Sequence, residues 1–206
     1  MVKKRNIALI AAGALGIGTI AATQIDRHYN LYYATNTAYC TIRNALLGTE
    51  GEADISIELC YENSLTRKQA INSRAAFENA REEYRDEFNI VFRVMSEKTA
   101  ESKDECLENN ADISLFFVPE IPDSNKADAE TTQGLANRRD NSIIIAYSQY
   151  RECLESTLLH EFGHMFYAEH SNNPDCVMFH HRACFRFDNW CDDEKAVITK
   201  YKHRFW

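Results

Sequence analysis

The stretch from Glu152 to Tyr167 (ECLESTLLHEFGHMFY) decides how the rest of the chain can fold. Apolar residues recur along it at the spacing of one helix face, namely Leu154, Leu158, Phe162, Met165 and Phe166. This period predicts a helix with one apolar face. The segment before it, Ser142–Tyr147 (SIIIAY), is an apolar run typical of a strand that is buried on both faces. A buried strand followed by such a helix indicates a layered domain in which the helix packs on a sheet.

Upstream segments supply the other parts of this sheet. Residues 55–62 alternate between apolar and polar side chains, which is typical of a half-buried strand. Thr66 and Gln69 have the spacing of a capping box, so we expect a helix from there to about Asp86. Its inner face would use Ala70, Ala76, Phe77, Ala80 and Tyr84. Further strands are expected at Asn89–Met95 (NIVFRVM), at Ala111–Val118 (ADISLFFV) and, as a short edge strand, near Gly134–Ala136.

A final helix is expected from Asp192 to about Phe205, after an irregular segment. We therefore predict an α/β (α+β) fold with one mixed twisted sheet. The sheet would carry the helix at 152–167, a backing helix and the C-terminal helix. This single domain would span residues 53–206, and residues 26–52 would form a linker or N-terminal extension.

The N-terminus has the pattern of an export segment. Three basic residues at positions 3–5 precede an uncharged stretch from Ile7 to Ile25, which is typical of a signal peptide. The apolar part is slightly shorter than the ~20 residues of a membrane span, and Ala21–Thr23 is only a weak cleavage site. We therefore expect residues 1–25 to be either a signal peptide or an uncleaved membrane anchor. In both cases the body of the protein would lie outside the cytoplasm.

Charge and cysteine content restrict the partners and the compartment. The chain carries a formal net charge of -8, and an acidic protein repels the phosphate backbone, so no nucleic-acid partner is expected. Contact with a membrane is expected only through the N-terminal segment. Outside the cytoplasm, several of the seven cysteines would pair as disulfides, in a connectivity that the sequence leaves open.

The predicted helix at 152–167 contains an H-E-x-x-H motif, from His160 to His164. Two histidines four residues apart lie on one helix face, so both can reach one metal ion. Glu161 beside them can act as a general base on metal-bound water. A further histidine, His170, follows six residues after the motif, and Met178 follows eight residues after that.

This pattern resembles the signature of the metzincin zinc peptidases, H-E-x-x-H-x-x-G-x-x-H followed by a Met-turn. The segment from His170 to Phe179 (HSNNPDCVMF) looks most like the archaemetzincin or matrixin-like branch of that family. The order of the predicted elements is also similar to a metzincin catalytic domain. The resemblance implies that His160, His164 and His170 hold one catalytic zinc ion, with Glu161 as the general base.

One departure from the signature concerns the end of the helix. Tyr167 stands where the family has a glycine, whose left-handed backbone lets the third histidine turn back to the metal. A non-glycine residue in that conformation costs about 1–2 kcal/mol. If His170 is the third ligand, we expect either a positive φ at Tyr167 or a wider loop. Asp175 and Glu194 are the alternative third ligands.

A second departure concerns the additional four-cysteine zinc site of archaemetzincins. Ser171 and His180 stand where two of its cysteines are expected, so the resemblance does not carry that site over. A rebuilt site could use Cys176, His180 or His181, Cys184 and Cys191. Disulfides are the preferred interpretation of these cysteines. His180 could instead donate to a developing oxyanion, although a surface histidine is the simpler reading.

These features predict an exported zinc metalloendopeptidase with one Zn²⁺ per chain. The resemblance to metzincins implies that the peptide or protein substrate binds extended along an edge strand, for which the segment near Gly134–Ala136 is the candidate. Two alternatives stay open. The chain could be a non-catalytic exported zinc-binding module on the same scaffold, or a zinc hydrolase that acts on a non-peptide substrate.

Overall fold

The computed structural model describes residues 51–107, 111–121, 133–179 and 189–205. Its centre is a five-stranded sheet in the order β2-β1-β3-β5-β4. The strands are β1 (Ala53–Glu62), β2 (Ile90–Ala100), β3 (Ile113–Val118), β4 (Gly134–Asn137) and β5 (Ser142–Ala146). β1, β2, β3 and β5 run parallel, whereas β4 pairs antiparallel with β5 at one edge. The predicted mixed sheet, including its short edge strand, is confirmed.

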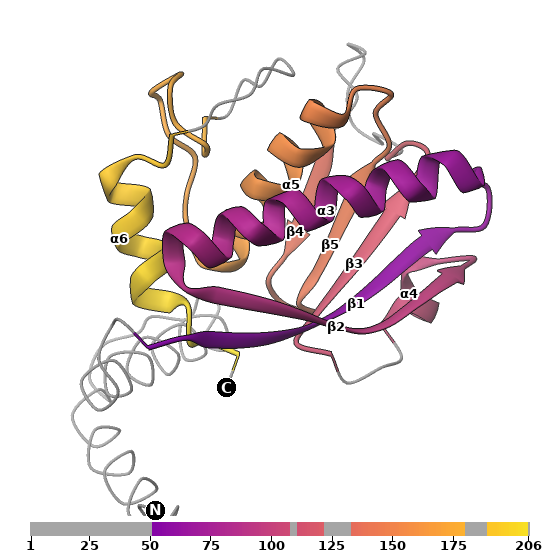
Figure 1. The fold of residues 1–206 in the computed structure, drawn as a ribbon, viewed down its shortest axis with the longest axis horizontal. Helices are drawn as coiled ribbons and strands as arrows, with labels where there is room; N and C mark the ends of the chain where they lie inside the picture. The colour runs from indigo at the N-terminus through magenta and orange to yellow at the C-terminus, as the bar shows by residue number, and fades with distance from the viewer. Residues whose placement is uncertain (1–50, 108–110, 122–132, 180–188, 206) are drawn as a thin grey trace, which may run out of the picture.

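The helices within these ranges are α3 (Arg67–Phe88), α4 (Lys103–Cys106), α5 (Arg151–Met165) and α6 (Asp192–Tyr201). α3 and α5 lie together on one face of the sheet, and α6 lies near one end of α3 (Figure 1). The rings of Phe77 and Phe162 are 6.3 Å apart between centroids, and the hydroxyl of Tyr84 donates to the carbonyl of Leu159 at 2.9 Å. These contacts hold α5, which carries the H-E-x-x-H motif, firmly against the backing helix.

The ends of α3 follow from its sequence. Gln69 N–H donates to the Thr66 hydroxyl at 3.3 Å, and the Gln69 side chain accepts from the Thr66 N–H at 2.8 Å, so the predicted capping box is confirmed. The helix closes at Asn89, whose φ is 55°. Its predicted inner face is buried except for Ala70, which is half-buried. None of the helices in the described ranges is long and apolar enough to cross a membrane. The expected export segment at 1–25, and the linker up to residue 50, lie outside those ranges.

Several element boundaries differ from the predictions. β2 continues past Met95 to Ala100 because it stays paired with β1 up to Glu62. The last residues of β2 are mostly polar because the strand lies at an edge of the sheet. A polar strand shows no apolar alternation, so the sequence pattern did not indicate it. The short helix α4 was not predicted. The last two helices end earlier than expected, α5 at Met165 and α6 at Tyr201.

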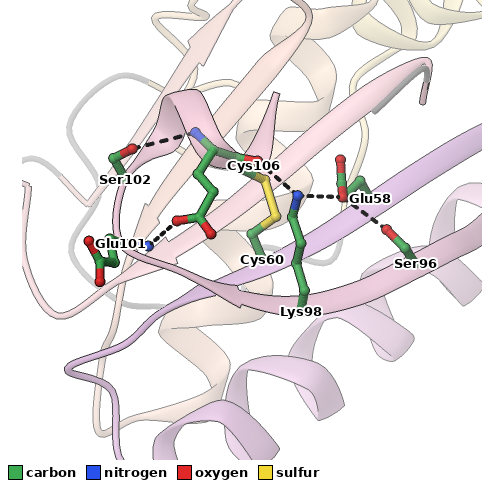
Figure 2. Close-up of a disulfide and its surroundings, with 8 residues drawn as sticks. Glu58, Cys60, Ser96, Lys98, Glu101, Ser102 and Cys106 are labelled. Carbon is green, nitrogen blue, oxygen red and sulfur yellow. Dashed lines mark hydrogen bonds and ion pairs between the residues drawn. A yellow bond between two sulfur atoms is a disulfide. The ribbon is translucent and has the colours of Figure 1, made fainter. Parts of the chain in front are cut away.

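The prediction that β1 is half-buried is wrong at Glu58 and Cys60, which are both fully buried. Cys60 forms a disulfide with Cys106 of α4, which covers this second face of the sheet (Figure 2). The Glu58 carboxylate accepts a hydrogen bond from Ser96 at 2.9 Å and lies 3.2 Å from the ammonium of Lys98. A buried charge is tolerated when it is paired in this way. The alternation of β1 correctly predicted which face of the strand packs in the main core. It did not predict that α4 buries part of the opposite face.

Candidate metal centre

Helix α5 and the turn after it bring three histidine side chains to one place. Nε2 of His164 lies 3.1 Å from Nε2 of His160 and 3.1 Å from Nε2 of His170. The potential ligand atoms of these three residues all lie within 4.8 Å of one another. His160 is buried, His164 is half-buried and His170 is exposed, so the group opens to solvent on the His170 side. The structure thus brings together all three histidines that the sequence singled out.

Backbone carbonyls determine which nitrogen carries the hydrogen in two of the rings. Nδ1 of His160 lies 3.0 Å from the carbonyl oxygen of Val177, and Nδ1 of His164 lies 2.8 Å from that of Ala168. A carbonyl oxygen only accepts hydrogen bonds, so both Nδ1 atoms are the donors. In neutral rings, both Nε2 lone pairs therefore point at the shared centre. Two lone pairs 3.1 Å apart repel each other unless a cation lies between them, so this donor set fits a metal ion.

The spacing of the three nitrogens fits zinc in particular. Tetrahedral coordination with zinc–nitrogen bonds of about 2.0–2.1 Å places neighbouring ligand nitrogens roughly 3.3 Å apart. The Nε2 atoms here are 3.1 Å apart in two of the three pairs. Structural zinc sites usually have four protein ligands, whereas catalytic sites have three and leave one position open. Within the described residues, the three-histidine group matches the second kind.

The end of α5 explains how His170 returns to the other two histidines. The N–H of Tyr167 donates to the carbonyl of His164, and the N–H of Ala168 donates to the carbonyl of Gly163, each at 3.0 Å. These two bonds define a Schellman motif, with Tyr167 as its left-handed residue at a φ of 67°. The expected positive φ is confirmed. The reversal also presents the carbonyl of Ala168 to the His164 ring.

The side chain of Tyr167 compensates for its unusual backbone. It is only 5% exposed, and its ring lies 4.8 Å from that of Tyr201. The guanidinium groups of Arg138 and Arg204 lie 5.1 and 4.9 Å from the Tyr167 ring centroid. Each cation–π contact contributes about 0.5–2 kcal/mol. Together with burial of the ring, these contacts offset the backbone cost of about 1–2 kcal/mol.

Met178 packs directly against the motif helix. A Cβ atom added to Gly163 would lie 2.4 Å from the Met178 sulfur, so the contact requires glycine at that position. The carbonyl of Met178 accepts from the N–H of Ser171 at 2.8 Å, which joins the segment after His170 to the methionine. Met178 is fully buried beneath the histidine group's helix. This arrangement gives α5 an apolar support on the side of Gly163.

Glu161 lies against the first residue of the edge strand. It is 7% exposed, and a Cβ atom added to Gly134 would lie 2.6 Å from its Cγ and 2.7 Å from its Oε1. The same Cβ would lie 2.7 Å from Cγ2 of Thr157, one helical turn earlier. The backbone of β4 therefore approaches α5 more closely than a side chain at position 134 would allow. The sequence signal was a single glycine in a predicted strand, which often marks such an approach.

Glu194 and Asp175, the two carboxylates considered as alternative third ligands, do not lie with the histidines. Glu194 accepts hydrogen bonds from the N–H groups of Met178 and Cys191, at 2.9 and 3.1 Å. Asp175 is exposed. Neither belongs to the three-histidine group. Sequence reasoning considered Glu194 only as a ligand and missed its bond to the Met178 backbone.

Disulfides take up cysteines that could have formed a second metal site. Cys176 is bonded to Cys191, which removes two thiolates from the rebuilt site. The other ligands considered for it, His180, His181 and Cys184, lie outside the described residues. The preferred disulfide interpretation is confirmed for this pair.

Comparisons with known proteins address the fold. The sequence matches no family model and no curated protein. The crystal structure of an archaemetzincin from Methanopyrus kandleri is similar to this chain, with a TM-score of 0.55 and 16% sequence identity, over 71% of this chain and 94% of that one. A zinc-dependent peptidase from Methanocorpusculum labreanum gives a TM-score of 0.46 and 14% identity, over 69% of this chain and 99% of that one. The fold that positions the three histidines is therefore similar to that of an archaemetzincin.

Proposed function

We propose that this chain is a zinc-dependent metallopeptidase that hydrolyses internal peptide bonds. The observation that carries the proposal is the pair of inward-facing Nε2 lone pairs on His160 and His164, fixed by the carbonyls of Val177 and Ala168. His170 completes a set of three imidazoles at a spacing suited to one zinc ion per chain. The similarity of the fold to an archaemetzincin is consistent with this assignment.

Each residue of the site has a defined task in this proposal. A zinc ion held by the three histidines would supply a Lewis acid and an acidified water. Glu161 takes the proton from the attacking water and passes it to the leaving amine. Its position against Gly134 restricts the directions in which its carboxylate can turn, so the base is held in place before substrate arrives.

The substrate would bind along β4. This strand is the last in the sheet and pairs only with β5 among the described strands, so its other edge is available to an extended peptide. Gly134, at the start of the strand, contacts Glu161, so a peptide that adds to β4 passes the general base. Main-chain hydrogen bonds would give most of the affinity, and pockets beside the strand would give selectivity.

We further propose that the protein acts outside the cytoplasm, secreted or anchored through residues 1–25. The basic and apolar pattern of that segment supports export. The disulfides Cys60–Cys106 and Cys176–Cys191 support an oxidising compartment. The net charge of -8 makes nucleic acid an unsuitable partner.

The proposal is tested by metal analysis together with a peptide assay. Purified protein should contain one equivalent of zinc, and it should cleave members of a mixed peptide library until a chelator is added. His170→Ala should weaken zinc binding strongly. Glu161→Gln should keep zinc and fold but reduce turnover by about 10²–10⁴-fold, because the amide has a similar shape without a basic oxygen.

The outcomes separate this function from its alternatives. Zinc without cleavage of any peptide would favour a non-catalytic module or a hydrolase of another bond. Esters and amides outside peptides would then be the next substrates to assay. Absence of zinc, or a loss of less than about tenfold in Glu161→Gln, would contradict the assignment itself.

A further inference from the structure

A pocket of about 410 Å³ opens beside the proposed catalytic site. It lies where β3 and β5 end and α5 begins, and its lining includes Glu120, Gln133, Tyr147, Tyr150 and Thr157. This volume is in the range of pockets that take small organic groups. The proposed mechanism makes no use of it.

Two contacts connect this pocket to the catalytic residues. Thr157 of its wall precedes Glu161 by one turn of α5, and both side chains lie where a Cβ atom on Gly134 would be. The Thr157 hydroxyl lies 3.3 Å from the amide oxygen of Gln133, the residue directly before β4. A peptide that lies along β4 and passes Glu161 therefore also passes close to Thr157 in the wall of the pocket.

The lining has a distinct chemistry. Glu120 is the one charged residue in it among the described parts of the chain, and neither lysine nor arginine is present to neutralise it there. Tyr147 and Tyr150 provide aromatic faces, and a 3.3 Å bond between the Asn72 amide and the Tyr147 hydroxyl holds one of these rings. The remaining wall combines the polar side chains of Gln133, Ser148, Gln149 and Thr157 with apolar ones such as Pro119, Ala146 and Leu154.

We propose that this pocket takes a lysine or arginine side chain of the peptide substrate, so that the enzyme prefers bonds close to a basic residue. The inference rests on the proposed peptidase function. The methylene stem of the side chain would pack on the tyrosine rings while its cation meets Glu120. The acidic charge of the chain, -8, also favours basic peptides over acidic ones.

Binding to a non-cleaving variant tests the pocket apart from catalysis. Zinc-loaded Glu161→Gln protein would be titrated with N-acetylated, C-amidated alanine hexapeptides that carry a single lysine, moved one position at a time. Matched peptides would carry norleucine, which has a similar stem without the charge. At one position, the lysine peptide should bind at least about fivefold more tightly, the ratio that corresponds to about 1 kcal/mol for a partly exposed ion pair.

Two further variants, each made in the Glu161→Gln background, identify the group responsible. Glu120→Gln should bring the ratio of lysine to norleucine affinity to about one, whereas Glu152→Gln should leave it unchanged. Glu152 is a suitable control because it is exposed in the first turn of α5, outside the pocket lining, and the change in charge is the same.

Each outcome bears on one proposal or both. Equal affinities for lysine and norleucine at every position, or a preference that Glu152→Gln reduces as much as Glu120→Gln, would overturn the pocket assignment. If either result is found and the protein with Glu161 intact still cleaves peptides, the peptidase function is supported and only the pocket assignment is wrong. A preference that depends on Glu120, without cleavage of any peptide by that protein, would support the pocket and contradict the peptidase. Peptides that are neither bound nor cleaved would contradict both.

Discussion

Glu194 and Met178 are joined by a hydrogen bond of 2.9 Å from the methionine N–H to the glutamate carboxylate. The peptide group that contains this N–H also contains the carbonyl of Val177, which lies 3.0 Å from Nδ1 of His160. One peptide plane therefore links Glu194 at the start of α6 to the first histidine of the metal centre. The second carboxylate oxygen of Glu194 accepts the N–H of Cys191 at 3.1 Å, so both oxygens face N–H donors.

Replacing Glu194 with glutamine should destabilise the protein by about 1–3 kcal/mol, because the new NH₂ group would face a buried N–H donor. The Val177 carbonyl should then be less firmly oriented toward His160, and zinc affinity should fall by up to about tenfold. Urea unfolding and a zinc titration measure the two effects. Asp193→Asn is the matched control, since Asp193 is exposed in the same helical turn. Similar effects in both variants would show that charge alone matters.

Adding one carbon at Gly134 should impair the site without removing the metal. In Gly134→Ala the new methyl group would lie within 2.7 Å of both Glu161 and Thr157, so the strand or the Glu161 side chain must move. A displacement near 1 Å costs about 10²-fold in rate, so kcat should fall strongly while zinc content stays at one equivalent. Met95→Ala, at a 69% exposed position on β2 at the opposite edge of the sheet, is the control and should keep its turnover. Full activity of Gly134→Ala would disprove the close approach.

Tyr167→Gly tests how the chain tolerates a left-handed tyrosine at a position where the signature that it resembles has glycine. From the sequence alone, glycine at this position is expected to stabilise the fold if φ is positive, because it relieves about 1–2 kcal/mol of strain. The buried ring reverses that expectation, since loss of a buried aromatic side chain costs about 3–5 kcal/mol. We therefore expect a net destabilisation of about 1–4 kcal/mol in urea unfolding.

Asn89→Gly is the control for the backbone contribution. Asn89 has a φ of 55° and is exposed, so glycine there removes strain without removing a buried ring. Because asparagine tolerates the left-handed conformation, the free energy of unfolding should change by less than about 1 kcal/mol. A Tyr167→Gly protein as stable as Asn89→Gly would show that the ring contacts of Tyr167 contribute nothing.

Asp140 should make stability depend on pH at acid values. Although burial alone raises its pKa, hydrogen bonds from Lys103 and Ser142 and the charge of Lys103 lower the pKa overall. A carboxylate with a lowered folded pKa stabilises the protein above its unfolded pKa of about 3.9, and this contribution disappears as pH falls through the folded pKa. Asp140→Asn should therefore cost about 0.5–1 kcal/mol at pH 7 after solvent screening, and progressively less as pH falls through the folded pKa. A difference that stays constant across this range would contradict the pairing.

The sequence predicted those parts of the fold and site that depend on local spacing. A helix places residues four apart on one face whatever surrounds it, so the juxtaposition of His160 and His164 followed from the sequence alone. The capping box at Thr66 and the apolar run at Ser142–Ala146 are local in the same sense. The positive φ at Tyr167 was one of two expectations, the other being a wider loop, and it came from the resemblance to a signature with a left-handed glycine at this position.

Only the tertiary structure decided what depends on contacts between distant segments. The Val177 carbonyl reaches His160 from a different segment, held by a carboxylate on α6. Gly134 meets Glu161 because β4 closes the sheet edge against α5. Glu58 and Cys60 are buried because a four-residue helix covers the second face of β1. The period of a sequence fixes which face of an element is apolar, whereas close packing between elements fixes which polar atoms meet across them.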